Sequence, residues 1–218
     1  MPANEIQAKA FIEKLASDLK PSPVLEKNGQ ALLRWSVIST LAVVAEFLVT
    51  GGFRPRAFSQ IASSPAFLFE TVVGVALVYF SGYAAVLLRI PDESRGDWVR
   101  WTPLVLMALF CASVAAGFFW PKFSYTEEHH RYYCAVAIMA FGIIPTWLLY
   151  DILAAGAPTQ PQWSGALVIL ASMGLPMVLM EVGCMYSPEH VLFDHILPVF
   201  LMALLGAKLL GKKFKERL

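Results

Sequence analysis

Six long apolar segments constrain this chain more than any other feature of its sequence. They cover approximately residues 33–53, 66–88, 101–120, 132–150, 163–183 and 191–210, and each is close to the roughly 20 residues that an α-helix needs to cross a bilayer. Hydrophobic residues make up 57% of the chain and charged residues only 15%, unlike a soluble domain. We therefore predict an all-α integral membrane protein built as a six-helix transmembrane bundle.

The positive charges predict the orientation of this bundle. Of the 17 Lys and Arg residues, five lie in the N-terminal arm and the first turn of the first span, three lie between the second and third spans, and five follow from Lys208 onward. Cytoplasmic segments are enriched in these residues, so both termini are expected in the cytoplasm. The net charge of +1 provides no general basic field, and we expect no direct nucleic-acid ligand.

Residues 1–30 are predicted to form a cytoplasmic arm before the transmembrane domain of residues 31–218. Within the arm, Phe11, Ile12, Leu15 and Leu19 recur at helical spacing before Pro21 ends the pattern, which predicts a short amphipathic helix. Its polar side is almost balanced in charge, which favours a groove on a protein partner over anionic lipid. Packing on its own bundle or on the bilayer is the alternative, since so short a helix is marginal in water.

Two cysteines and all four histidines are predicted to lie at the outer face. Cys134 opens the fourth span and Cys184 ends the fifth, whereas Cys111 lies near mid-membrane and is interpreted as a core residue. The two outer cysteines could form a disulfide, because the ends of neighbouring spans can approach closely enough. They could instead stay reduced and react with oxidants or soft metals.

The outer histidines and acids could hold zinc or copper. However, His190 and His195 are five residues apart rather than the four that would align them on one helix face, and no HExxH or CxxC motif is present. Ordinary solvated loop residues are therefore the competing interpretation. The histidines concerned are His129, His130, His190 and His195.

Three acids interrupt the apolar segments, namely Glu46, Glu70 and Glu181. A carboxylate facing lipid is costly, so each is a candidate functional residue, and a snorkelling or hydrogen-bonded role is equally open. An ion or metal transporter using these acids is one alternative function. A membrane thiol oxidoreductase using the outer cysteines is another, although no nucleophile with an obvious base appears. We expect no cofactor and no enzymatic activity.

Several stretches together resemble one family, the NrsF-type membrane anti-sigma factors, which are negative regulators of an extracytoplasmic-function sigma factor. They are FIEKLASDLKPSPV in the arm, RP and SPAF within GGFRPRAFSQIASSPAFLFE, the Ile90-Pro91 pair, the loop GAPTQP followed by SGAL, and the two outer cysteines. The resemblance covers nearly the whole chain, and the order and spacing of these stretches carry it.

The resemblance implies a regulator in the bacterial inner membrane. Its cytoplasmic arm would hold a sigma factor, and its outer cysteines would report on conditions outside, through oxidation or a thiophilic metal. The partners expected are therefore a sigma factor and membrane lipid. The identity of the sigma factor, the stimulus and the oligomeric state are left open.

Overall fold

The computed structural model describes residues 11–14, 25–54, 56–90, 98–122, 133–184 and 186–217. Within these ranges the chain is helical and contains no strand, and six helices are long and apolar enough to cross a membrane. The predicted all-α bundle of six spans is thus confirmed. The spans are α2 (Asn28–Val49), α4 (Pro65–Leu88), α5 (Trp98–Ala116), α6 with α7 (Cys134–Phe141 and Ile143–Ala154), α8 (Pro161–Gly183), and the continuous run of α9 (Pro188–His190), η1 (Val191–Ile196) and α10 (Leu197–Lys215), while the short α3 (Ala57–Ser63) joins α2 to α4.

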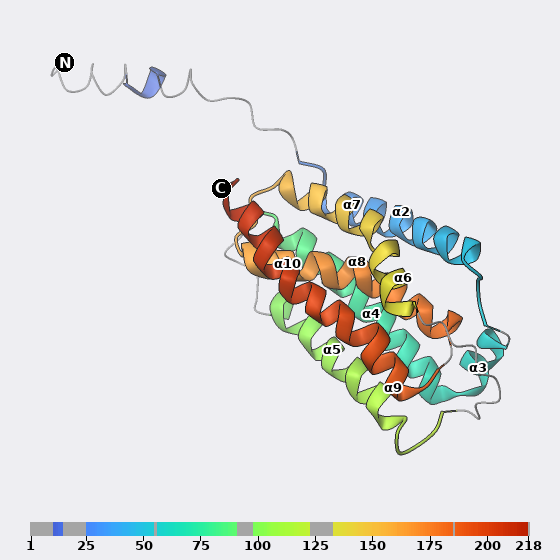
Figure 1. The fold of residues 1–218 in the computed structure, drawn as a ribbon. Helices are drawn as coiled ribbons and strands as arrows, with labels where there is room; N and C mark the ends of the chain where they lie inside the picture. Colours follow the sequence, from blue (N-terminus) through green and yellow to red (C-terminus); the bar gives the residue numbers. More distant parts are fainter. Residues whose placement is uncertain are drawn as a thin grey trace.

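Helix α8 is the centre of the bundle (Figure 1). Its side chains are buried along almost the whole helix, against α4, α7 and α10. Glycines let α8 and α10 approach closely: a Cβ added at Gly165 would lie 2.4 Å from the carbonyl oxygen of Gly206. Without a hydrophobic driving force between helices in lipid, such close backbone packing is what holds spans together.

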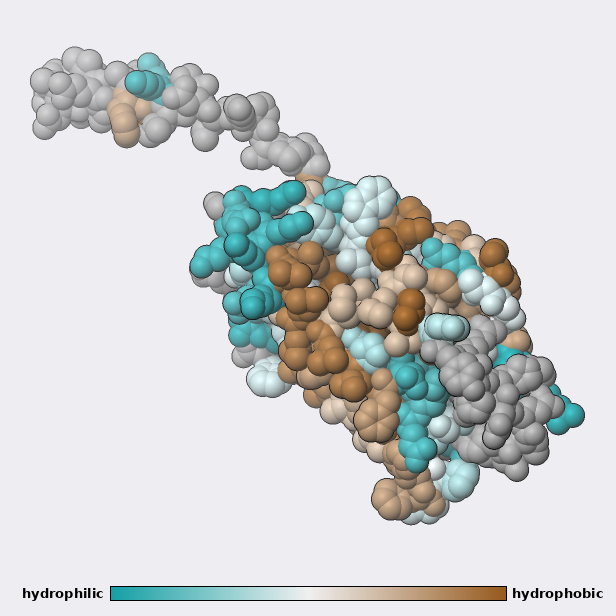
Figure 2. All heavy atoms as spheres, viewed as in Figure 1, coloured by the Kyte–Doolittle hydropathy of each residue, from teal (hydrophilic) through white to brown (hydrophobic). Residues whose placement is uncertain are grey.

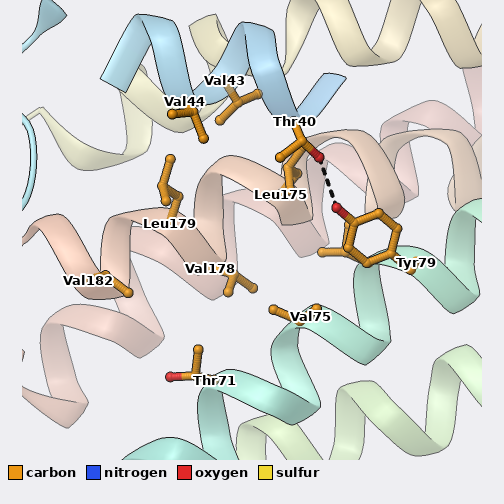
Figure 3. A pocket seen from close by; sticks show the side chains of 11 residues that line it. Thr40, Val43, Val44, Thr71, Val75, Tyr79, Leu175, Val178, Leu179 and Val182 are labelled. Atoms are coloured by element: carbon orange, nitrogen blue, oxygen red, sulfur yellow. Dashed lines mark hydrogen bonds between the residues drawn. The ribbon is translucent and has the colours of Figure 1, made fainter. Parts of the chain in front are cut away.

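Helix α2 lies at the periphery and buries a single stripe of residues. Between the C-terminal half of α2 and helices α4 and α8 is an apolar pocket of about 230 Å³, lined mostly by valines and leucines (Figure 3). Thr40 on α2 and Tyr79 on α4 share a hydrogen bond of 2.9 Å at its edge. Helix α2 is therefore less tightly packed than α8 and can shift at less cost to the core.

We call the end of the bundle where α2 begins and α10 ends the terminal end. Here the buried guanidinium of Arg89 donates from Nε to Oδ1 of Asn28 at 3.1 Å and from Nη2 to the carbonyl of Glu26. The carbonyl of Arg89 accepts from the backbone N–H of Ala157 at 2.8 Å. A Cβ at Gly156 would lie 2.5 Å from that carbonyl oxygen, which explains the glycine. Arg89 thus joins the GAPTQP loop to the start of α2.

The opposite end, which we call the cysteine end, contains the starts of α6 and α9 and the last turn of α8. The fourth span bends before it reaches the terminal end, because α6 stops at Phe141 and α7 starts after Gly142. Pro145 follows and lacks the N–H that would continue the ladder. Its own carbonyl accepts a hydrogen bond from the indole Nε1 of Trp35 at 3.1 Å, which ties α7 to α2.

Candidate functional site

Four soft-metal ligands converge at the cysteine end. Cys134 is the first residue of α6, Cys184 caps the C-terminus of α8, His190 ends α9, and His195 lies in η1. One donor atom from each of them lies within 4.8 Å of the other three. The two Sγ atoms are 3.0 Å apart, and Nε2 of His190 lies 3.1 Å from Sγ of Cys184. We call these four residues the Cys/His cluster.

A π-helix brings the two histidines together. Residues 191–196 adopt i→i+5 hydrogen bonding, which widens the turn so that residues five apart can also meet on one side of the helix. The rings of His190 and His195 meet edge to face with centroids 4.9 Å apart. The expectation that a spacing of five keeps these histidines off a common face is therefore wrong, because it assumed the α-helical period.

Burial also contradicts the interpretation of these histidines as solvated loop residues. Cys184 and His195 are fully buried, Cys134 is 2% exposed, and the side chain of His190 is 15% exposed. Within the part of the chain that the structure describes, neither ring nitrogen of His195 makes a hydrogen bond of normal geometry, although the ring is close enough to Cys184 to affect its thiol. A buried hydrogen-bond donor or acceptor without a partner costs folding free energy. A metal ion bound at the cluster would give this ring a partner.

The charges around the cluster favour a thiolate and an oriented imidazole. Oδ2 of Asp194 lies 2.7 Å from Nδ1 of His190, which fixes the ring so that Nε2 faces Cys184. Hydrogen bonding from the thiol of Cys134, aided by the two imidazoles, holds the pKa of Cys184 well below the usual range of a thiol, although burial opposes the shift. A thiolate is the form that binds metals and attacks oxidants.

The backbone of Cys184 is bound to the segment that follows α2. Nη1 of Arg54 donates to the carbonyls of Glu181 and Cys184, both at 2.6 Å. Next to them, the ring of Phe47 on α2 covers Gly183, where an added Cβ would lie 1.9 Å from Cζ of that ring. Cys184 and Gly183 are therefore in contact with the C-terminal end of α2 and the segment that follows it.

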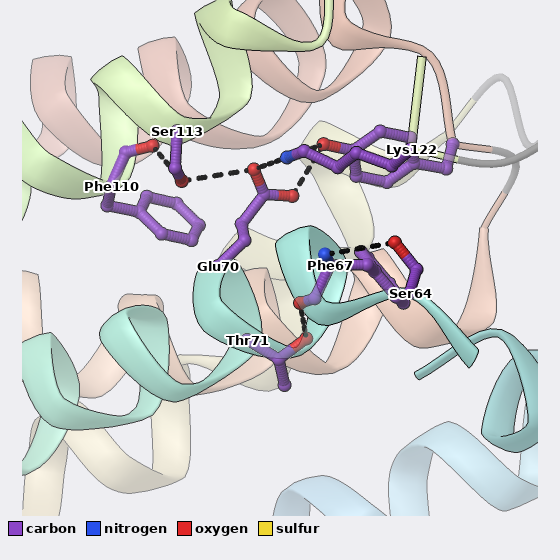
Figure 4. A network of polar contacts seen from close by, with 8 residues as sticks. Ser64, Phe67, Glu70, Thr71, Phe110, Ser113 and Lys122 are labelled. Carbon is purple, nitrogen blue, oxygen red and sulfur yellow. Dashed lines mark hydrogen bonds and ion pairs between the residues drawn. The ribbon is translucent and has the colours of Figure 1, made fainter. Parts of the chain in front are cut away.

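A buried ion pair between Lys122 and Glu70 lies at the same end of the bundle as the cluster, and Figure 4 shows the pair and its hydrogen bonds. Lys122 donates to Oε2 of Glu70 on α4 and to the hydroxyl of Tyr186 at 2.6 Å. That hydroxyl donates to Oε1 of Glu70 at 2.5 Å, and Ser113 on α5 donates to Oε2 at 3.1 Å. Because Tyr186 follows Cys184 by two residues, the network joins α4 and α5 to the same segment as the cluster.

The other two intramembrane acids differ from Glu70. Glu181 is fully buried, and among the described residues neither of its carboxylate oxygens has a hydrogen-bond partner; it interacts electrostatically with Glu70, Lys122 and Arg54. Glu46 is half-buried on α2. The structure thus gathers Glu70 and Glu181 at the cysteine end and leaves Glu46 apart from the Glu70 network.

Several predicted site residues fall elsewhere. Phe11 and Ile12 are 62% and 63% exposed in the short helical segment 11–14. Leu15, Leu19, His129 and His130 lie outside the described residues. Cys111 is half-buried on α5 and is not a member of the cluster.

Sequence reasoning missed the basic residues that organise the two ends. In the sequence, these residues were used only to predict the orientation of the bundle. In the structure, Lys122 pairs with a buried acid, and Arg54 and Arg89 bind backbone carbonyls. The sequence did contain a signal for the pairing of Lys122 with Glu70. An acid such as Glu70 inside an apolar span requires a partner, and few cations in this chain lie near a span end on the same side.

Comparisons with known proteins identify the family of this chain. A search of curated proteins and a search of solved structures each found no match. A family comparison matches residues 15–214 to NrsF, described as negative regulator of sigma F, which confirms the resemblance seen in the sequence motifs. This family is regulatory and is not a known class of enzyme, and its description implies a sigma factor as partner. The chain belongs to the NrsF family of negative regulators of sigma F.

Proposed function

We propose that this negative regulator holds its sigma factor at the cytoplasmic face of a bacterial inner membrane through the arm of residues 1–30. The Cys/His cluster lies on the outer face and releases the sigma factor when it binds a thiophilic metal or is oxidised. The observation that carries the proposal is the convergence of two thiols and two imidazoles on one buried point, next to the outer end of the helix that leads to the arm.

The composition of the cluster favours a metal such as Zn²⁺ or Cu⁺. Two thiolates and two imidazoles suit both ions. Tetrahedral zinc ligands stand about 3.3–3.8 Å apart, and the four donor atoms here all lie within 4.8 Å of one another, so small shifts suffice. A metal would also satisfy the unpartnered ring of His195.

Oxidation is the second route to the same event. An oxidant that accepts two electrons would join Sγ of Cys134 to Sγ of Cys184, with release of the thiol proton of Cys134 and of the proton of Cys184 where that thiol is protonated. The separation of 3.0 Å makes this reaction accessible. It gives no role to His195, which is why the metal is the preferred stimulus.

The route from cluster to arm runs along α2. A new bond at Cys184 displaces the carbonyl that Arg54 binds and the glycine that Phe47 covers. Both contacts sit at the outer end of α2, and Asn28 at its other end is held by Arg89, directly after the arm. A peripheral helix of 22 residues can carry such a shift as a rigid element.

The arm would bind its sigma factor through its apolar side. Phe11 and Ile12 are exposed, and Leu15 and Leu19 continue the same helical stripe in the sequence. Burial of four such side chains in a groove follows the helix-in-groove mode of recognition.

A metal titration of the full chain in detergent micelles, under reducing conditions, tests the cluster. We expect one Zn²⁺ or Cu⁺ per chain, measured by competition with a chromophoric chelator. His195→Gln should weaken binding by at least about 10–100-fold, since even outer-shell changes have that effect. Cys111→Ser is the matched control and should bind normally. Equal affinity in native protein and His195→Gln would refute the metal site.

A sigma-dependent reporter tests the coupling and the arm separately. Arg54→Gln should retain metal binding and lose metal-induced release, whereas Cys184→Ser should lose both. Leu15→Asp with Leu19→Asp should give constitutive transcription at normal protein levels, and Ser17→Asp on the polar side is the control. If the leucine variants still repress, the arm is not the binding element.

A further inference from the structure

A basic groove lies at the terminal end, far from the Cys/His cluster. It is a hollow of about 870 Å³ between the start of α8 and the last three turns of α10. Exposed lysines 208, 212 and 215 line the α10 side. Hydrophilic residues gather at this end of the molecule beside the apolar surface of α10 (Figure 2).

The groove continues on the other side of Trp163. Trp163 and Gln160 also line a smaller hollow of about 350 Å³, which is shared with Arg100, Trp101 and Leu104 of α5. Two tryptophans therefore stand at the level where the lysines begin, and tryptophan side chains prefer the boundary between headgroups and acyl chains. The wall changes from basic to apolar toward the membrane centre, ending at Leu204 and Leu104.

The floor of the groove is the N-terminus of a buried helix. Gln160 caps α8 without a side-chain hydrogen bond, and Pro161 occupies the first turn. The helix dipole makes this end favourable for an anion. Lys208 and Lys215 are separated by seven residues, about 10 Å along the helix axis, so the positive charge extends over the length of a phospholipid headgroup.

We propose that this groove binds the headgroup of an anionic phospholipid. The phosphate would contact the lysines and the start of α8, and the acyl chains would follow Leu204 and Leu104 into the bilayer. A basic pocket between spans is a recognised form of lipid binding site. The inference is independent of the proposed function, because it uses neither the arm nor the cluster.

Native mass spectrometry of the full-length protein tests this proposal. Protein in mixed micelles with equimolar phosphatidylglycerol and phosphatidylcholine should retain the anionic lipid at least about tenfold more often. The triple variant Lys208→Gln, Lys212→Gln and Lys215→Gln should lose most of this preference, because a single lysine near an anionic headgroup contributes up to about fivefold. The control triple Lys27→Gln, Lys213→Gln and Arg217→Gln removes the same charge at the same end from residues that do not line the groove.

Three results would overturn the proposal. The native protein could retain both lipids equally, or the control triple could lose as much preference as the groove triple, which would indicate a general basic surface. The groove triple could also keep its lipid preference and lose the sigma factor in a pull-down, which would make the groove a protein docking surface. Circular dichroism verifies that each variant is folded.

Discussion

Replacing Lys122 with methionine perturbs the buried ion pair beside the Cys/His cluster. The side chains of Lys122 and Glu70 are 3% and 0% exposed, so water does not screen them. The substitution keeps most of the apolar stem and removes the ammonium, which leaves the Glu70 carboxylate, among the described residues, with Tyr186 and Ser113 as hydrogen-bond donors.

The burial of the ion pair sets the expected loss of unfolding free energy. Removing one partner of a buried pair leaves an uncompensated charge and destabilises a protein by about 3–5 kcal/mol, whereas an exposed pair contributes about 0–1 kcal/mol. The double variant Glu70→Gln with Lys122→Met removes both charges and should be more stable than Lys122→Met alone. With Glu70→Gln alone as the second single variant, the double-mutant cycle isolates the interaction energy of the pair.

Unfolding in mixed micelles by increasing dodecyl sulfate, followed by helical circular dichroism, measures these free energies. Lys212→Met is the matched control, because Lys212 is 77% exposed and pairs with Glu216 at 3.8 Å. If Lys122→Met destabilised the chain no more than this control, the pair would not be buried and the network would not hold the segment after Cys184.

Three further variants probe the helix contact, the junction and the thiolate. Gly165→Ala forces a Cβ to within 2.4 Å of a backbone carbonyl on α10 and should destabilise the bundle by about 1–3 kcal/mol in the same assay. Arg89→Met removes two charge-assisted hydrogen bonds at the start of α2, and tryptic cleavage after Lys27 should accelerate on the order of tenfold or more. The lowered pKa of Cys184 predicts that thiolate absorbance persists as the pH falls well below the usual thiol range, and Cys134→Ala should make it disappear at a higher pH.

Controls for these variants come from the same chain. Gly29→Ala adds a Cβ with no atom within 4 Å and should leave stability nearly unchanged. Cys111→Ser should leave the thiolate titration unchanged, whereas Cys184→Ser should abolish its low-pH part. An unaltered cleavage rate in Arg89→Met would mean that Asn28 is held without the guanidinium.

The spans and the family were predictable because both depend on local sequence. Hydropathy over about 20 residues identifies a membrane helix whatever its neighbours are, and the GAPTQP and SPAF stretches keep their order along the chain. The division into a cytoplasmic arm and a transmembrane domain, and the orientation of the termini, stay predictions.

The candidate site was only partly predictable, and one helix explains why. Cys134 and Cys184 were expected at the same face because they stand at neighbouring span ends. His195 was not expected beside them, because its register depends on residues 191–196 being a π-helix, and no sequence period signals that local change. The pairing of Lys122 with Glu70, 52 residues apart, is likewise a property of the packed bundle.

The energy available at the Cys/His cluster is large compared with what the proposed switch requires. Moving an equilibrium from 1:99 to 99:1 takes about 5.5 kcal/mol of preference for one state, and structural zinc sites provide about 10–16 kcal/mol. Such a preference would arise if the cluster offered the metal fewer than four ligands in the state that holds the sigma factor. Cys134, Cys184 and the two histidines come from three separate segments, so a small displacement of one segment changes the ligand number. In the proposed switch, the displacement that completes the site would also move the helix leading to the arm, because Arg54, which follows α2, binds the carbonyl of Cys184.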